Sequence, residues 1–260
     1  MEKDALGSPW AEEHRYKPDL ASRLPYVRGL ESFCARNQGV IVHHHGGWAE
    51  SVRAHWKFAV PIPEALDSEV AGPLMCAGST VFSPMIHYGV DSTMKVAVVG
   101  IGGLGHLAVQ FLAAFGCEVT AISTTHSKDD EARAMGASHF LATRGTDELK
   151  RAAGSFDFIL STVAVDLPWA DYVGALRPRG RLCLVGVPES ALPIPAFPLL
   201  QERSVCGASV GSPSDTATML GFAARKGVRP VVEPFPMAEV NRALAHLRAG
   251  KARYRIVLHA

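Results

Sequence analysis

The fold is decided by residues 95–115, which read Lys-Val-Ala-Val-Val-Gly-Ile-Gly-Gly-Leu-Gly-His-Leu-Ala-Val-Gln-Phe-Leu-Ala-Ala-Phe. The apolar run 96–99 is rich in β-branched valine and predicts a short strand. Three glycines then follow in the spacing G-x-G-x-x-G, and they are Gly100, Gly102 and Gly105. Apolar residues recur at helical spacing after the first two glycines. The stretch therefore predicts a strand that turns tightly into a helix.

The glycines of this turn have separate roles in a dinucleotide site. Gly100 makes the turn, Gly102 lets the backbone approach a pyrophosphate, and Gly105 lets the helix pack on the strand. The free amides and the positive dipole end of the helix bind phosphate, so Gly103 and Leu104 join the candidate cofactor-binding residues. The alternative is an ordinary glycine-rich strand–turn–helix that holds no ligand. The strands and helices that flank this turn favour the dinucleotide site.

The composition is that of a globular protein without a strong charge bias. The chain has 260 residues, enough for two domains, with 48% hydrophobic and 20% charged residues. A net charge of +1 gives no electrostatic reason to expect nucleic acid or an anionic membrane as partner. No apolar run reaches the length that spans a bilayer, and the polar N-terminus does not resemble a signal peptide. Five cysteines without a C-x-x-C pair indicate a reducing compartment, so we expect a cytoplasmic protein.

The first part of the chain has weak signals. Residues 1–38 carry mixed charge, three prolines and no sustained period, so we expect irregular structure there. Segments 48–52 and 57–61 resemble short β segments broken by turns, and residues 66–90 have a helical composition. No internal repeat is present.

Strands and helices alternate from residue 95 onward. The expected strands are 95–100, 118–123, 139–142, 156–162, 181–187 and 204–210. The expected helices between them include 102–115, 128–135 and 167–176. This alternation predicts an α/β fold with a doubly wound parallel sheet and the strand order 3-2-1-4-5-6. Beyond it we expect helices 214–226 and 238–248 and strands 230–233 and 254–258.

The end of the second strand indicates which dinucleotide binds. In such folds an acidic residue at this place binds the ribose 2′-hydroxyl of NAD, whereas its absence beside a cation suits the 2′-phosphate of NADP. Here the strand ends in Ser123 and Thr124, no carboxylate precedes Asp129, and Lys128 supplies a positive charge. We therefore favour NADP. In the alternative, Ser127 caps a helix and Lys128 is a solvated surface charge.

Several segments together resemble the zinc-type medium-chain dehydrogenases, in their cinnamyl alcohol dehydrogenase-like, NADP-dependent branch. They run in family order over about 46–260 and are 46–52, 73–84, 96–106, 157–163, 184–187 and 253–257. The resemblance implies a Rossmann domain at 90–212. It also implies an incomplete GroES-like catalytic domain, built from 1–89 and completed by 213–260.

The resemblance also implies roles for individual residues. Cys76 matches a catalytic zinc ligand, and Thr80 matches a residue beside the nicotinamide. Ser123, Thr124 and Lys128 match the 2′-phosphate site. The segments that match the rest of the cofactor site contain Thr162, Val163, Gly186, Val187, Ser209 and Val210. Without the resemblance, Cys76 would be read as a small buried apolar residue, because free cysteine often has that role.

The zinc ligands are where the chain departs from the family. The other family ligands, a Cys and a His-Glu pair, lie in an N-terminal stretch that this sequence does not contain, and Cys76 alone does not hold a metal. Residues 29–34 resemble only the end of the family's structural zinc lobe, so we expect no structural zinc. Residues 43–45 are three consecutive histidines. Because neighbours in an extended segment point to opposite faces, we favour a solvated loop over a metal site there.

The leading functional hypothesis is an NADP-dependent oxidoreductase that interconverts primary alcohols and aldehydes by hydride transfer, impaired by the missing zinc ligands. In an intact family member zinc polarises the carbonyl as a Lewis acid. One alternative is an inactive NADP-binding remnant or interaction protein, and another is a zinc-independent NADPH reductase of enones or quinones. The partner is then a small molecule. Family members commonly form homodimers through the sheet edge near 204–210, which extends the same expectation to this chain.

Overall fold

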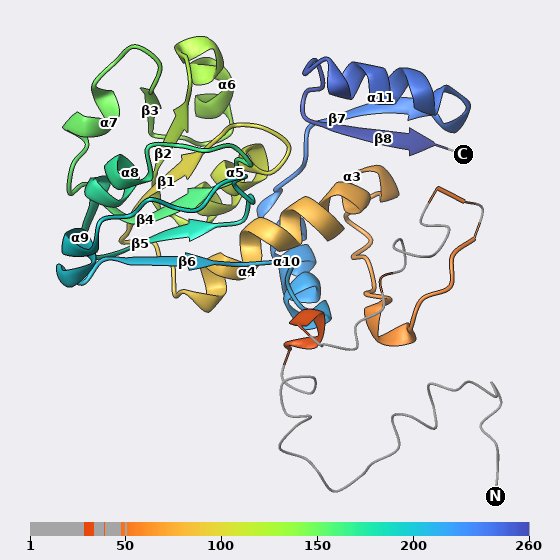
Figure 1. Cartoon of the computed structure of the whole chain (residues 1–260). Coiled ribbons are helices and arrows are strands. Elements are labelled where there is room, and N and C mark those ends of the chain that lie inside the picture. The colour runs from red at the N-terminus through yellow and green to blue at the C-terminus, as the bar shows by residue number, and fades with distance from the viewer. Residues whose placement is uncertain (1–28, 34–38, 40–47, 50, 260) are drawn as a thin grey trace, which may run out of the picture.

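A six-stranded parallel sheet forms the centre of the computed structural model, which describes residues 29–33, 39, 48–49 and 51–259 (Figure 1). The strands are β1 (Lys95–Val99), β2 (Glu118–Ser123), β3 (His139–Ala142), β4 (Phe156–Ser161), β5 (Leu176–Leu184) and β6 (Ser204–Gly207). Their order is β3-β2-β1-β4-β5-β6, which confirms the doubly wound topology expected from the sequence.

Successive residues of each strand face opposite sides of the sheet, and helices cover both sides. Val96 and Val98 face α4 (Ser79–His87) and α5 (Gly105–Phe115), whereas Ala97 and Val99 face the other side. That other side is covered by α7 (Glu148–Arg151) and α8 (Trp169–Ala175). Strands buried on both faces are nearly continuous in apolar residues, which explains why they were clear in the sequence.

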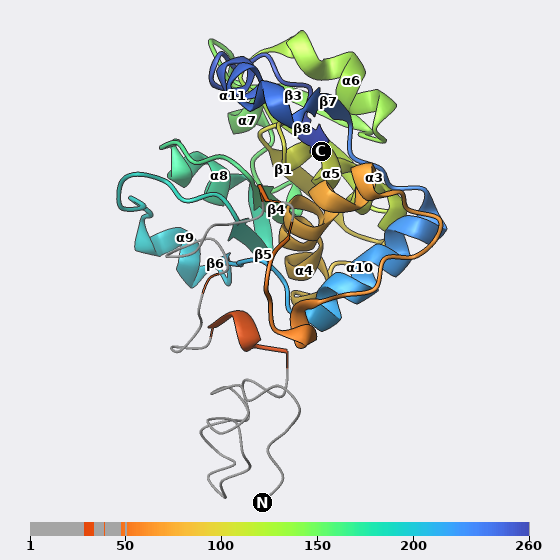
Figure 2. The same ribbon diagram turned by 90° about the vertical axis from the view of Figure 1, so that its right-hand side faces the viewer.

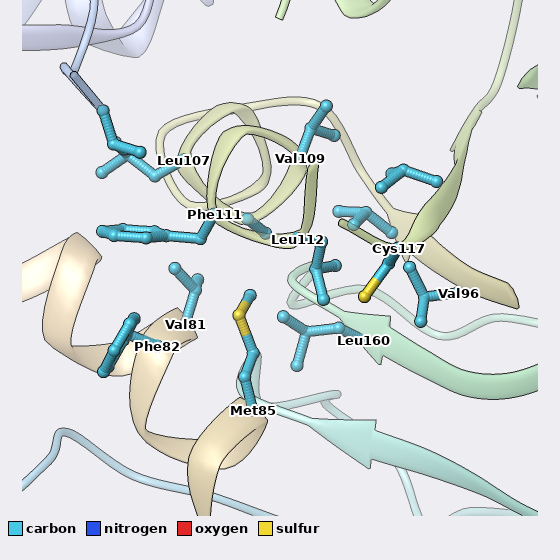
Figure 3. Close-up of a cluster of buried hydrophobic side chains, with 14 of the residues drawn as sticks. Val81, Phe82, Met85, Val96, Leu107, Val109, Phe111, Leu112, Cys117 and Leu160 are labelled. Atoms are coloured by element: carbon cyan, nitrogen blue, oxygen red, sulfur yellow. The ribbon is translucent and has the colours of Figure 1, made fainter. Parts of the chain in front are cut away.

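The larger core cluster lies where α5 packs between α4 and the sheet (Figure 3). Phe111 and Leu112 of α5 are fully buried, and the ring of Phe111 meets the ring of Phe82 from α4 edge-on at 5.3 Å. Met85 and Leu160 fill the space between α4 and β4. Each fully buried side chain of this size stabilises the fold by about 1.5–3 kcal/mol. The helix that follows the glycine turn is therefore fixed by core packing.

One continuous helical stretch precedes the sheet. It consists of α3 (Ser68–Pro73), the π-helical turn η3 (Leu74–Gly78) and α4, joined without a break, and it confirms the helical composition of 66–90. Before it lie two 3-10 turns, η1 (Glu31–Phe33) and η2 (Trp56–Phe58). The prediction of a β segment at 57–61 was wrong, and the described residues of 48–52 form no strand either. An isolated apolar run has no ladder partner in the described part of the chain, so it does not form a strand.

The C-terminal part of the chain returns to this first helical stretch (Figure 2). Helix α10 (Pro213–Lys226) packs against α4 and begins with a capping box between Ser212 and Asp215. After it come β7 (Val232–Pro236), η5 (Met237–Glu239), α11 (Val240–Arg248) and β8 (Arg255–His259). The two strands pair in parallel, and β8 also contacts α3.

Three further short helices complete the described elements. They are η4 (His126–Lys128), α6 (Asp129–Ala134) and α9 (Ala196–Leu200). The sequence did not indicate α7 or α9, which have only four and five residues and carry little periodic signal. In the described residues, no helix combines the length and apolar character needed to cross a membrane.

Candidate functional site

The glycine turn between β1 and α5 has the geometry that its sequence predicts. Gly100 has a φ of +87°, a conformation that glycine adopts without strain. A Cβ on Gly105 would lie 1.8 Å from the carbonyl oxygen of Gly100, so only glycine lets α5 approach the strand this closely. A Cβ on Gly102 would meet nothing within 4 Å. The middle of the turn is therefore open in front of the backbone, where a pyrophosphate would lie.

The carboxyl end of β4 supports the turn from the next strand. The hydroxyl of Thr162 donates to the carbonyl oxygens of Val99 and Gly100, at 2.9 Å each. A Cβ on Gly186 would lie 2.1 Å from the carbonyl oxygen of Val163, so the ends of β4 and β5 approach closely. Thr162, Val163 and Gly186 were predicted from separate segments, and the structure brings them to the same edge of the sheet as the glycine turn. Ligands of open parallel sheets bind at this edge.

Lys128 links the end of β2 to the glycine turn. Its Nζ donates to the carbonyl oxygen of Ile101 at 2.5 Å and lies 5.2 Å from the centre of the Tyr254 ring. Burial, and then the positive charge of Arg253, lower the pKa of the Lys128 ammonium below its ordinary value. The negative charge of Glu131 opposes this shift. Ser123 is half-buried and Thr124 exposed at the same end of β2.

Arg255 approaches the same turn from the far end of the sequence. Its Nε donates to the carbonyl oxygen of Gly103 at 2.9 Å. Burial lowers the pKa of Arg255, and the neighbouring Cys76 opposes this shift. Sequence reasoning gave Arg255 no role, although the segment 253–257 was part of the family resemblance. Its position only becomes evident once β8 is placed beside the turn.

His106 and Tyr254 fasten this C-terminal segment to the turn. The Nδ1 of His106 lies 3.0 Å from the carbonyl oxygen of Gly102, and its Nε2 accepts a hydrogen bond from the amide of Val231 at 3.2 Å. Because Nε2 accepts, the proton is on Nδ1 and the ring is neutral. Burial is the main cause that lowers the pKa of His106 to about 4. The ring of Tyr254 stacks on His106 at 4.8 Å.

Tyr254 also connects to α6. Its hydroxyl donates to the carboxylate of Glu131, which raises the pKa of Tyr254 in addition to the larger effect of burial. Sequence reasoning missed both Tyr254 and His106, because a histidine on an apolar helix face and a tyrosine in a short strand are common core residues. Their placement matters because it holds Lys128 and Arg255 on the two sides of Gly102.

The remaining predicted residues lie at varied depths around this edge. Cys76 is exposed, Thr80 and Leu104 are half-buried, and Val187, Ser209 and Val210 are exposed. The last three follow β5 and β6, whose carboxyl ends lie at the same edge as the glycine turn. A hollow of about 500 Å³ lies next to Tyr254, between α5, α6 and the segment before β8. Its lining includes none of the predicted cofactor-binding residues.

The described residues do not fit a zinc ion. In the described part of the chain, no group of three or more His, Cys, Asp or Glu side chains is arranged to hold a metal. Cys76 therefore has no second and third ligand there, whereas a catalytic zinc takes three protein ligands. Cys34 and the histidines at 43–45 lie outside the described residues.

Comparisons with known proteins agree with this geometry. Residues 103–225 match a family model described as zinc-binding dehydrogenase. The chain is 48% identical over 233 residues to aldehyde reductase AdhA of Synechocystis, covering 89% of this chain and 69% of the relative. It is 37% identical over 240 residues to NADP-dependent alcohol dehydrogenase C 1 of Mycolicibacterium smegmatis, covering 88% and 69%.

Solved structures of alcohol dehydrogenases are also similar to this chain. The chain is similar to the cinnamyl alcohol dehydrogenase SbCAD4 of Sorghum bicolor, with a TM-score of 0.80, 36% identity, and coverage of 90% of this chain and 70% of that one. It is also similar to a CAD structure from Helicobacter pylori complexed with NADP(H), with a TM-score of 0.69 and 31% identity, covering 76% and 57%. The chain thus spans only part of the length of these relatives.

Proposed function

Because this chain belongs to the zinc-binding dehydrogenase family, in its cinnamyl alcohol dehydrogenase-like branch, we propose that it binds NADP(H) as its cofactor. One observation supports this most. Lys128 lies in the middle of the chain and Arg255 near its C-terminal end, yet their cationic groups hydrogen-bond to the carbonyls on either side of Gly102, at Ile101 and Gly103. Two cations that flank an open glycine form a surface that suits a pyrophosphate and a second phosphate.

The proposed binding mode assigns each group a task. The amides at the start of α5 face the pyrophosphate, helped by the positive end of the helix dipole. Arg255 supplies the countercharge next to this pyrophosphate. Lys128, with the hydroxyls of Ser123 and Thr124, binds the 2′-phosphate of the adenosine ribose. The nicotinamide then reaches towards Thr80 and the exposed segments after β5 and β6.

The proposed reaction is hydride transfer between the nicotinamide and the carbonyl carbon of an aldehyde. In the reductive direction NADPH gives a hydride and the alkoxide takes a proton, which yields a primary alcohol and NADP⁺. The described residues supply cofactor binding and orientation for this reaction.

A second candidate is favoured by the isolation of Cys76 from other metal-ligand side chains in the described residues. In this case the chain binds NADP(H) without turning over alcohols, as a cofactor-binding remnant or interaction protein. The two candidates share the cofactor site and differ only in turnover. A homodimer through the edge strand β6 stays a prediction, as does the division into a catalytic domain (1–89 and 213–260) and a Rossmann domain (90–212).

The cofactor assignment is tested by replacing Lys128 with alanine and titrating NADPH and NADH by fluorescence. We expect NADPH to bind about 10- to 100-fold more weakly, because a charge-assisted hydrogen bond contributes roughly 1.5–3 kcal/mol. NADH lacks the 2′-phosphate, so its affinity should change little. Lys150→Ala, which removes an exposed lysine from α7, is the matched control and should affect neither.

Arg255→Gln separates the two phosphate sites. Because the pyrophosphate is common to both cofactors, this change should weaken NADPH and NADH by a similar factor. If Lys128→Ala weakened the two cofactors equally, Lys128 would not bind a 2′-phosphate and the NADP assignment would fail. If neither cofactor bound the unaltered chain at millimolar concentration, the proposed function itself would be wrong.

A further inference from the structure

Two cysteines face each other on the last two strands of the large sheet. Strands β5 and β6 pair in parallel, and their register places Cys183 directly opposite Cys206. Neighbouring strands are about 4.8 Å apart. Disulfides join Cα atoms that are about 4.4–6.8 Å apart. The backbone therefore places this pair at a separation that a disulfide bridges without a large movement.

The two side chains also project to the same side of the sheet. Both belong to the core cluster on the α4 and α5 face, whereas their neighbour Leu182 belongs to the cluster on the opposite face. The two thiols shift each other's pKa, and the Sγ of Cys206 lies 3.6 Å from the carbonyl oxygen of Leu182. Both thiols are free in this structure. The two cysteines are thus paired across neighbouring strands on one face of the sheet, which places their sulfur atoms where they can react with each other.

The surroundings make the two thiols unequal. The hydrogen bond from Cys183 lowers the pKa of Cys206 and outweighs its burial, and the positive charge of Arg181 lowers it further. The same interaction, with burial next in size, raises the pKa of Cys183. The Arg181 guanidinium is held beside the pair, since it lies 4.7 Å from the centre of the Tyr88 ring and donates to the Tyr88 carbonyl at 3.1 Å.

The solvent exposure of the two thiols also favours reaction at Cys206. Cys183 is fully buried, whereas Cys206 lies on the edge strand and is partly exposed. A small oxidant therefore meets Cys206 first. Since the thiolate is the reactive form of cysteine, the more acidic and more accessible sulfur is the first to react.

We propose that Cys183 and Cys206 form an oxidant-sensitive dithiol site that closes to an intrachain disulfide between β5 and β6. The oxidant is hydrogen peroxide. The Cys206 thiolate attacks one peroxide oxygen, the O–O bond breaks, and a sulfenic acid and hydroxide result. The Cys183 sulfur then attacks the sulfenic sulfur, the S–O bond breaks, and the departing hydroxide takes the thiol proton as water. Overall two thiols lose two electrons and two protons, and one peroxide becomes two waters.

The test detects the disulfide bond directly and does not depend on cofactor binding. The folded full chain is treated with hydrogen peroxide, remaining thiols are alkylated, and the chain is digested with trypsin. Cleavage after Arg181, Arg203 and Arg225 places the two cysteines on separate peptides, 182–203 and 204–225. We expect these peptides to appear joined, 2 Da lighter than their sum, in most chains. Dithiothreitol should separate them again.

Matched variants make the test specific. Cys206→Ser and Cys183→Ser should each abolish the joined peptide, and circular dichroism should show both variants folded. In Cys183→Ser the first step still occurs, so Cys206 should be trapped by dimedone as a sulfenic acid. Cys117→Ser, which removes a buried thiol that bonds to the Asp91 carbonyl, should leave the joined peptide unchanged.

Two results would overturn the proposal. One is a folded, peroxide-treated chain in which Cys183 and Cys206 are both still alkylated while other cysteines are oxidised. The other is a joined peptide that appears to the same extent in urea, because pairing would then not depend on the strand register. A sulfenic acid on Cys206 that persists in the unaltered chain would also contradict the second step.

Discussion

His106 is the residue whose protonation state the fold fixes most firmly. Its ring is fully buried, and its Nε2 must stay unprotonated to accept from the amide of Val231. Protonation would place a positive charge near Arg255 and replace this acceptor by a donor. The ring therefore couples the glycine turn to the C-terminal segment only in its neutral form.

This arrangement predicts a loss of stability in acid. The pKa of His106 is about 4 in the folded chain, against about 6.5 for the free side chain. The unfolded chain therefore binds the proton first, and the contribution of neutral His106 is complete above pH 6.5 and lost as the pH falls towards 4. Linkage gives a loss of about 2 kcal/mol between pH 7 and pH 5.

Urea unfolding of the wild type and His106→Gln at pH 7 and pH 5 measures this contribution. The difference in free energy of unfolding between the two proteins should shrink by about 2 kcal/mol at the lower pH. An equal pH dependence in wild type and His106→Gln would show that His106 is not held neutral.

Two glycines of the turn into α5 have different roles. Gly105 has a structural role, and Gly102 has a proposed ligand-binding role. Gly105→Ala would place a methyl group 1.8 Å from the Gly100 carbonyl, and α5 cannot retreat because Phe111 and Leu112 are packed in the core. We expect the variant to lose about 3 kcal/mol of stability or more, at the upper end of overpacking costs. Thermal unfolding measures this loss.

Gly102→Ala is the matched change in the same turn. Its added methyl group meets nothing within 4 Å, so the stability should change by less than about 1 kcal/mol. The methyl group would, however, occupy the space proposed for the pyrophosphate, and NADPH should bind at least about 10-fold more weakly. A stable Gly102→Ala variant with unchanged NADPH affinity would place the pyrophosphate elsewhere.

At the scale of the whole molecule, sequence reasoning succeeded where a pattern was local. The strands of the sheet and the turn at Gly100 follow from alternation, glycine spacing and apolar runs within one short segment. The positions of Arg255 and His106 do not, because each depends on contacts between the C-terminal segment and a turn more than 120 residues earlier in the chain. The segment 57–61 was misread because a β-rich composition forms a strand only beside another strand.

In the candidate site, too, the sequence predicted some features and not others. Thr162 and Gly186 were assigned to the cofactor site from family resemblance. In the structure one bonds the turn and the other allows two strand ends to approach, and their role in cofactor binding stays a prediction. The exposed Val187, Ser209 and Val210 make no contact that identifies a role. Their proposed part in cofactor binding depends on a ligand and cannot be inferred from packing.

The proposed function also makes a prediction about metal binding at Cys76. In the described residues, Cys76 belongs to no group of three or more side chains that could hold a metal. We therefore expect no zinc at Cys76, so that the zinc content measured by elemental mass spectrometry should be the same in the unaltered chain and in Cys76→Ser. NADPH binding should persist in chelator, because Lys128, Arg255 and the glycine turn need no metal. About one zinc per chain that is lost in Cys76→Ser would contradict this expectation. Ligands outside the described residues would then complete the site, and alcohol turnover would be favoured over cofactor binding alone.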